Sequence, residues 1–170
     1  MAPPTPPATL AALSELPPLV AHLLARRGIA TMAEAREFLD AAESLFEDPR
    51  TLPDVDRAIA RIAQARERGE TVAVYGDFDA DGVTSSALLT EGLRALGARP
   101  IPYIPDRVSE GHGLNLPALH FLHQQGVRLV LTADCGITSV AEVAAATELG
   151  MDIVITDHHT PPERVPNAVA

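Results

Sequence analysis

The sequence contains no lysine, so all 13 of its basic side chains are arginines. Its 23 acidic residues outnumber them and leave a formal net charge of -10 at pH 7. This balance argues against a protein that coats nucleic acid through charge alone, because such a protein needs a basic face. It does not exclude an enzyme that binds phosphodiesters through metal ions, because bound cations reverse the local electric field.

Cysteine is nearly absent as well, and Cys135 is the only one in the chain. A single cysteine cannot form an internal disulfide, which fits a reducing cytoplasm. The preceding Asp134 should raise the pKa of the Cys135 thiol. We therefore interpret Cys135 as a small packing residue and not as a nucleophile.

Long apolar runs are missing too. No segment approaches the ~20 apolar residues that a membrane helix needs. The Pro-rich opening has neither the basic residues nor the apolar run of a secretory signal. We therefore expect a cytoplasmic protein that makes no use of a membrane.

The chain is long enough for one domain with a real core, and we expect two further regions before it. Residues 1–15 form a Pro-rich, disordered tail, in which residues 10–16 could be a short helix. Residues 16–69 form an N-terminal helical segment, and residues 70–170 form an α/β domain. The helices expected in the segment cover residues 17–27, 31–40 and 54–68, and the second opens with the capping-box pattern of Thr31 and Glu34.

From residue 71 onward, strand-like and helix-like segments alternate. The expected strands cover residues 71–76, 100–104, 128–133 and 152–156, and the expected helices cover residues 83–97, 115–125 and 138–149. This alternation predicts a doubly wound, mainly parallel α/β sheet with helices on both faces and right-handed crossovers. Residues 165–170 look like the approach to a further strand, so we expect the sequence to be the first part of a longer protein that is truncated here.

Acidic residues and a histidine pair follow three of these strands. They are Asp77, Asp79 and Asp81 after the first strand, Asp134 after the third, and Asp157, His158 and His159 after the fourth. In α/β folds the ligand crevice lies outside the carboxyl ends of the strands. We therefore expect the three clusters to converge on a site for divalent metal ions.

The first cluster has its aspartates at every second position. In an extended chain, alternate side chains point the same way, so all three can face one crevice. Two carboxylates ~4 Å apart repel by about 4 kcal/mol at an effective dielectric constant near 20. A fold keeps such a cluster only if a cation sits inside it, and Gly76 and Gly82 bracket the turn as expected for a close backbone approach.

Two other interpretations of this segment fit less well. A calcium loop of EF-hand type needs a glutamate at its twelfth position, where counting from Asp77 gives Leu88. A phosphatase of the haloacid-dehalogenase type resembles residues 79–83, but it generally holds phosphate with a lysine, and this chain has none. It also leaves the histidine pair unexplained, so we favour a two-metal phosphohydrolase.

Asp134 alone could equally be a helix cap, but the histidine pair after the fourth strand favours a functional role in metal binding. Oxygen-rich ligation with one imidazole suits Mn²⁺ or Mg²⁺ better than Zn²⁺. Two such ions would clamp the attacking and leaving oxygens of a phosphoryl transfer and generate hydroxide near neutral pH. The histidine that is not a ligand could contact phosphate or act as an acid.

At this point the sequence resembles a known family. Residues 74–85, 133–137 and 157–159 are similar to the first three motifs of the DHH phosphoesterases, and most similar to the RecJ-type exonucleases. Residues 104–107 and 110–115 and the opening at 16–19 and 26–28 are RecJ-like too, so the resemblance covers residues 16–170. It implies Mn²⁺- or Mg²⁺-dependent hydrolysis of single-stranded DNA from the 5′ end, in recombination and repair, with DNA-repair proteins as partners.

The resemblance also implies residue roles. Asp79, Asp81, Asp134 and His158 correspond to metal ligands, and Asp77 is a ligand or supports one. His159 corresponds to a catalytic residue near the scissile phosphate, and Asp157 would orient the histidines. The residues that could contact the nucleic-acid backbone are Arg107, His112 and Asn115, for which loop polarity and turn formation are nearly equal explanations.

The sequence departs from the RecJ pattern in one large way. RecJ-like proteins carry a further metal-binding aspartate motif, a second domain with a Gly-Gly-His motif and commonly an OB-fold, none of which precedes Ala170. We therefore expect these 170 residues to bind metal with weak or no nuclease activity. The alternatives are a phosphoesterase acting on oligoribonucleotides, cyclic dinucleotides or pyrophosphate, and a non-catalytic fragment that binds metal or a partner protein.

Overall fold

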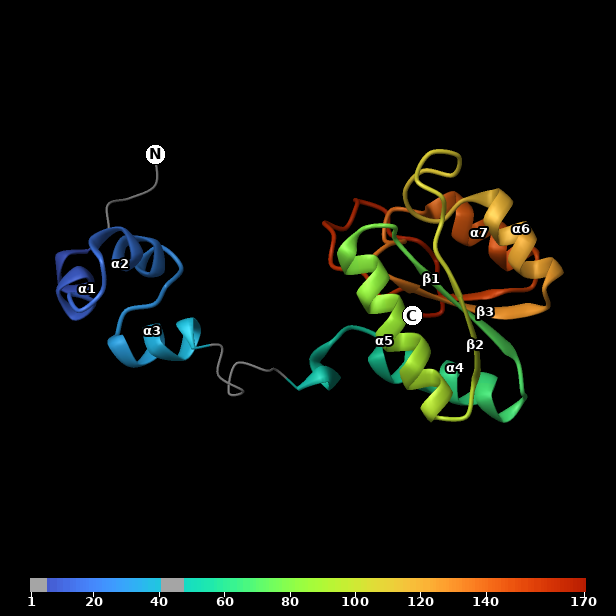
Figure 1. Ribbon diagram of the computed structural model, residues 1–170, viewed down its shortest axis with the longest axis horizontal. Helices are drawn as coiled ribbons and strands as arrows, with labels where there is room; N and C mark the ends of the chain where they lie inside the picture. The colour runs from blue at the N-terminus through green and yellow to red at the C-terminus, as the bar shows by residue number, and fades with distance from the viewer. Residues whose placement is uncertain (1–5, 41–47) are drawn as a thin grey trace. The chain divides into compact units, whose positions relative to one another are not determined.

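The structure is a computed structural model that describes residues 6–40 and 48–170 (Figure 1). The chain divides into two compact units, Met1–Thr51 and Leu52–Ala170. The first unit contains the helices α1 (Pro7–Ala12), α2 (Pro18–Ala25) and α3 (Met32–Leu39) and the short 3₁₀ helix η2 (Pro49–Thr51).

A small core holds the first unit together, and it begins earlier in the chain than we expected. Its buried residues are Leu13, Ala21, Leu24 and Ala35. Because Pro7 fixes a helical φ at the start of α1 and Leu13 is fully buried, residues 7–13 differ from the disordered tail expected over 1–15. The short helix expected over residues 10–16 lies three residues nearer the N-terminus, and residues 1–5 lie outside the described part.

The capping box at the start of α3 is confirmed. Oγ1 of Thr31 accepts a hydrogen bond from the amide of Glu34 at 3.3 Å, and the Glu34 carboxylate accepts one from the amide of Thr31 at 3.0 Å. These bonds satisfy amide groups that a helix N-terminus would otherwise leave unpaired.

The second unit begins with α4 (Val55–Glu67), which we had assigned to the helical segment. Ala65 of this helix is fully buried against Val72 and Val74, and Ala58 and Ile62 pack on the same cluster. The division of the chain therefore lies at residues 51/52, not 69/70, because the apolar face of α4 belongs to the core of the sheet.

Four parallel strands form the sheet, in the order β2-β1-β3-β4. They are β1 (Thr71–Gly76), β2 (Arg99–Tyr103), β3 (Val127–Ala133) and β4 (Asp152–Val154), and the helices between them are α5 (Ala80–Ala95), α6 (Leu116–Gln124) and α7 (Val140–Glu148). This confirms the predicted doubly wound α/β fold. Within residues 6–40 and 48–170, no helix is long and apolar enough to cross a membrane.

Strand β4 ends two residues earlier than we expected, for a local reason. The Thr156 amide donates to Oγ1 of Thr132 at 3.1 Å, and the Thr156 hydroxyl donates to the Thr132 carbonyl at 2.6 Å. Side-chain hydroxyl groups therefore continue the link between the two chain segments where the regular ladder stops. Beyond them, the amide of Ile155 donates to the Ala170 carbonyl at 2.9 Å, so the last residue contacts the β4 segment.

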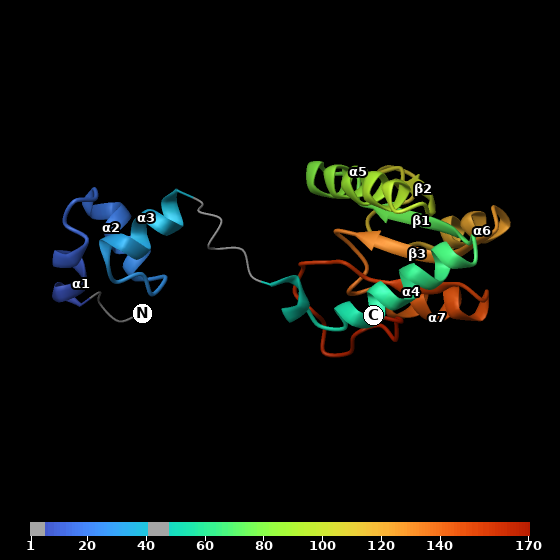
Figure 2. The same ribbon diagram turned by 90° about the horizontal axis from the view of Figure 1, so that it is seen from below.

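Alternating residues of the strands build one core on each face of the sheet. Val72, Val74, Leu129 and Leu131 pack with α4 and α5, and Figure 1 shows α5 lying across the strands. The opposite face packs with α6 and α7 through a cluster that includes Tyr75 and Val130, and Figure 2 shows the helices and strands from a second direction.

The order of the strands determines where the ligand crevice of the sheet lies. From β1 the chain passes through α5 to β2 on one side, and the later strands β3 and β4 add on the other side. The order therefore reverses between β1 and β3, and ligands bind at such a switch point, outside the carboxyl ends. Asp77 follows β1 and Asp134 follows β3, so these two residues lie at this position.

Candidate metal centre

The first motif turns sharply from β1 into α5. Asp77 is nearly buried, and its Oδ1 accepts a hydrogen bond from the Phe78 amide at 2.8 Å. A Cβ atom on Gly82 would lie 2.5 Å from the Asp77 backbone, and one on Gly76 would collide with the Ser86 hydroxyl. The two glycines are therefore needed because the first turn of α5 packs directly on the end of β1.

Asp79 is the N-cap of α5. Its Oδ1 accepts hydrogen bonds from the amides of Asp81 and Gly82, at 3.0 and 2.9 Å. Among the described residues, no donor contacts its other oxygen, which stays available to a cation.

Asp81 lies in the first turn of α5, so our reason for grouping the three aspartates is wrong for this residue. Extended-chain alternation cannot orient a side chain that belongs to a helix. The helix turn instead places Asp81 near the third motif, where its Oδ2 lies 3.6 Å from Nε2 of His158.

Asp134 follows β3 with a left-handed backbone, at φ 65°. Aspartate tolerates this conformation better than most residues. Its amide donates to the Thr156 carbonyl at 3.0 Å, which ties the residue to the end of β4. The helix-cap interpretation is excluded, because α7 begins at Val140 with Ser139 as its N-cap.

The Asp134 carboxylate is buried and short of donors. Its Oδ1 is shielded from solvent and has no hydrogen-bond donor in the described part of the chain, although Nε2 of His158 lies 2.9 Å away. Burial raises the pKa of Asp134, and the nearby charges of Asp81 and Asp79 raise it further. A bound cation would offset both the burial of this carboxylate and its repulsion by Asp81 and Asp79.

The side chain of Asp157 is almost fully buried and holds one histidine in place. It accepts hydrogen bonds from the amides of Ile137 and His159 at 2.9 and 3.1 Å, and Nδ1 of His159 lies 2.7 Å from its Oδ1. Burial alone would raise the pKa of Asp157, but these hydrogen bonds outweigh it and lower the pKa. The hydrogen bond to this carboxylate raises the pKa of His159 in turn.

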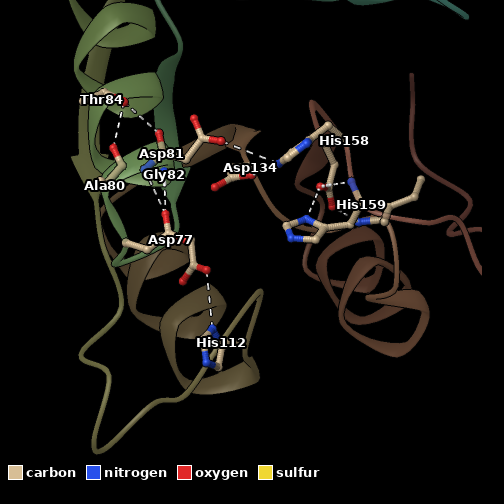
Figure 3. A network of polar contacts seen from close by, with 12 residues as sticks. Asp77, Ala80, Asp81, Gly82, Thr84, His112, Asp134, His158 and His159 are labelled. Atoms are coloured by element: carbon tan, nitrogen blue, oxygen red, sulfur yellow. Dashed lines mark hydrogen bonds and ion pairs between the residues drawn. The ribbon is translucent and has the colours of Figure 1, made fainter. Parts of the chain in front are cut away.

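The two histidines diverge although they are adjacent in sequence. His158 points to Asp134 and Asp81, whereas His159 points back to Asp157. Figure 3 shows His158 facing Asp81 and Asp134, with the ring of His159 beside it. One ligand atom each from Asp134, His158 and His159 can be chosen so that all lie within 4.8 Å of one another. Of these three residues, Asp134 and His158 are the candidate metal ligands, and His159, whose Nδ1 contacts Asp157, lies beside them.

The other predicted ligands lie around this group. Asp77 lines the same cavity of about 250 Å³ as Asp134 and His159, and its Oδ2 lies 3.4 Å from Nδ1 of His112 (Figure 3). Within the described ranges, no arginine lies within 4.0 Å of the carboxylates of Asp77, Asp79, Asp81, Asp134 or Asp157. The donor set consists of carboxylate oxygens and imidazole nitrogens around a buried carboxylate oxygen that has no hydrogen-bond donor in the described residues. It therefore fits a divalent cation.

Two of the three predicted substrate contacts meet at one aromatic ring. The Arg107 guanidinium lies 5.1 Å from the centre of the Phe78 ring, and the His112 ring packs on Phe78 at 4.3 Å. Phe78 was missing from our candidates, although its place between Asp77 and Asp79 in the motif was a usable signal.

Asn115, the third predicted contact, is the N-cap of α6. Its Oδ1 accepts from the Ala118 amide at 2.8 Å, and its Nδ2 donates to the Tyr75 hydroxyl at 3.0 Å and to Glu110 at 3.3 Å. Turn formation thus accounts for this side chain.

Cys135 packs in the core on the α6 and α7 face, as we predicted. Its Sγ lies 3.6 Å from the Tyr75 carbonyl oxygen, and burial, with a smaller effect of Asp157, raises the pKa of its thiol to about 12.

Comparison with known proteins agrees with this geometry. Residues 71–170 match the model of the DHH family, N-terminal domain. The single-stranded-DNA-specific exonuclease RecJ of Bacillus subtilis is 43% identical over 153 residues, which are 90% of this chain and 20% of that protein. The RecJ of Escherichia coli is 37% identical over 158 residues, which are 92% of this chain and 27% of that protein.

Two solved structures are also similar. RecJ from Thermus thermophilus in complex with Mn²⁺ has a TM-score of 0.69 at 34% identity and covers 98% of this chain and 24% of its own. An exonuclease RecJ bound to manganese has a TM-score of 0.65 at 41% identity, over 69% of this chain and 30% of its own. The chain spans about a fifth to a quarter of the length of the curated relatives named above. Because the family match extends over the whole sheet and all three acidic clusters, the chain belongs to the DHH family, whose N-terminal domain it carries at residues 71–170.

Proposed function

We propose that this chain carries the metal-binding part of the active site of a RecJ-type exonuclease. The reaction is hydrolysis of phosphodiester bonds from the 5′ end of single-stranded DNA, with two Mn²⁺ or Mg²⁺ ions. The observation that carries the proposal is the buried Oδ1 of Asp134, which has no hydrogen-bond donor among the described residues and lies 2.9 Å from Nε2 of His158, with His159 close by. The RecJ structures that contain Mn²⁺ or Mg²⁺ support the choice of ion.

The residues of the site have different proposed roles. Asp134 and His158 would hold one ion together with Asp81, and Asp77 and Asp79 would complete a second position nearby. Bound ions would polarise the phosphate and supply a nucleophile near neutral pH. Asp157 keeps the His159 ring oriented, so that its free nitrogen can donate a proton or a hydrogen bond at the phosphate.

Arg107 and His112 are the proposed contacts to single-stranded DNA. A guanidinium suits a phosphate group through its planar set of donors, and the Phe78 ring holds both side chains at the edge of the acidic cluster. The two relatives are roughly three and a half and four and a half times as long as this chain. We therefore propose that full activity and repair-protein partners belong to a longer protein, and that these 170 residues alone bind metal with weak or no nuclease activity.

A titration with Mn²⁺ tests the metal site directly. We expect the melting temperature of the chain to rise with Mn²⁺ concentration, because a ligand at 100 times its Kd stabilises a protein by about 2.7 kcal/mol. The Asp134→Asn variant, which keeps the shape and tolerates the left-handed backbone, should lose this response. Asp56→Asn on the exposed side of α4 is the control and should retain it.

Release of mononucleotides from a 5′-labelled single-stranded oligonucleotide tests the reaction. We expect slow or undetectable release by the 170-residue chain, and none by Asp134→Asn. Processive digestion by the chain alone would contradict the proposed need for a longer protein. Absence of any Mn²⁺ response would instead remove the basis of the whole proposal.

A further inference from the structure

Ser139 is a helix-capping residue that does not cap. It is the N-cap of α7, yet its side chain makes no capping hydrogen bond, whereas a serine at this position usually accepts one from the first turn. Its residue is only 8% exposed. In the described part of the chain, its hydroxyl has no hydrogen-bond partner.

The hydroxyl faces the cavity beside the metal centre. Ser139 and Gly113 both line this cavity, and a Cβ atom on Gly113 would lie 3.8 Å from Oγ of Ser139. The other walls include Asp77 and Asp134 on the metal side and His159. The Ser139 hydroxyl thus faces the space where the reaction is proposed to occur. It belongs to an almost buried residue and has no partner among the described residues.

Two other buried hydroxyl groups show that this position is different. The hydroxyl oxygens of Ser86 and Thr90 are shielded from solvent and have no partner in the described ranges, but they lie on α5 where it packs against the sheet, and neither residue lines this cavity. Their burial is explained by packing. Ser139 differs because it lines the cavity and its hydroxyl oxygen is not among the shielded atoms, so a ligand can reach it.

We propose that Ser139 donates a hydrogen bond to a phosphate oxygen of the substrate, an inference that rests on the function proposed above. The N-terminus of α7, a nine-residue helix, favours an anion at this point. A hydrogen bond to a charged phosphate is stronger than one between neutral groups. The cavity volume, about 250 Å³, lies below the ~300 Å³ at which pockets for drug-sized ligands begin, so it suits a phosphate with part of its sugar.

This phosphate site depends on the cation. Asp77 and Asp134 line the same cavity and repel an anion until a metal ion compensates them. Phosphate binding should therefore be undetectable in EDTA and appear once Mn²⁺ is added.

Calorimetric titration of the Mn²⁺-loaded chain with thymidine 5′-monophosphate tests the inference. We expect Ser139→Ala to bind Mn²⁺ within about twofold of the wild type but to bind the nucleotide about tenfold more weakly, or about 1.4 kcal/mol. Ser139→Thr, which keeps the hydroxyl, should bind more tightly than Ser139→Ala. Ser86→Ala is the matched control and should bind as the wild type does.

The outcomes separate this inference from the proposed function. Normal Mn²⁺ binding with unchanged nucleotide affinity in Ser139→Ala overturns the role of Ser139 and leaves the metal site standing. A chain that binds no Mn²⁺ overturns both. If Ser139→Ala melts early, Ser139→Gly removes the same hydroxyl with a residue that helix N-caps tolerate, and it must show the same selective loss of nucleotide affinity.

Discussion

The two ends of the sheet both bring carboxylates together, but among the described residues only the amino end pairs them with a permanently charged arginine. There, the guanidinium of Arg61 lies 2.7 Å from Glu70 and 2.5 Å from Asp152, and joins α4 to the starts of β1 and β4. At the carboxyl end, five aspartates gather with no arginine within 4.0 Å in the described residues.

The pKa shifts of Arg61 and Asp134 show the same contrast between the two ends of the sheet. Burial alone would lower the pKa of Arg61, but its hydrogen bonds to Asp152 and Glu70 raise it. At the other end, burial and neighbouring carboxylates raise the pKa of Asp134. A permanent positive charge therefore stabilises the amino end, whereas the carboxyl end is where we propose that a divalent cation binds.

Removing the guanidinium should have the largest effect on stability. We expect Arg61→Ala to lower the free energy of unfolding by about 3 kcal/mol, the low end for a broken buried ion pair, because Asp152 is half-exposed. Urea denaturation measures this. Arg57→Ala, which removes an exposed pair with Asp54, should cost less than about 1 kcal/mol; equal costs for the two variants would contradict the contrast.

Removing a charge at the carboxyl end should have the opposite sign when no metal is present. We expect Asp134→Asn to raise the free energy of unfolding in EDTA by about 1 kcal/mol, because it relieves repulsion from Asp81 and Asp79. Because the folded pKa of Asp134 is raised, its ionisation destabilises the metal-free fold as the pH rises through that pKa. Denaturation of both proteins at about pH 7 in EDTA measures the difference, and a loss of stability in the variant would show that the contact of Asp134 with His158 outweighs the repulsion.

The smallest effect should come from His159. Its folded pKa is raised by Asp157 above the ordinary value of 6.5. Protonated His159 therefore adds stability below about pH 6.5, and this contribution is lost as the pH rises through the folded pKa. We expect the melting temperature of the metal-free chain to fall slightly between about pH 6 and 8. His159→Gln should flatten that slope, and an unchanged slope in the variant would assign it to another group.

Local chemistry explains which parts of the fold could be predicted. The apolar runs before Asp77, Asp134 and Asp157 are strands, and the capping box at Thr31 is formed, because each depends on neighbours in sequence. The early start of α1 depends on the burial of Leu13 against α2 and α3. The placement of α4 depends on packing against strands that come later in the chain, so neither could be predicted from local pattern alone.

Local sequence patterns were enough to predict that acidic and imidazole groups follow the carboxyl ends of buried strands, because strand periodicity and turn chemistry are local properties. Which of these groups meet depends on long-range packing: His158 turns to Asp134, His159 turns to Asp157, Asn115 caps a helix, and Ser139 makes no capping bond. The reason is that these contacts join segments brought together by strand order and by the left-handed turn at Asp134, which no neighbouring residue specifies.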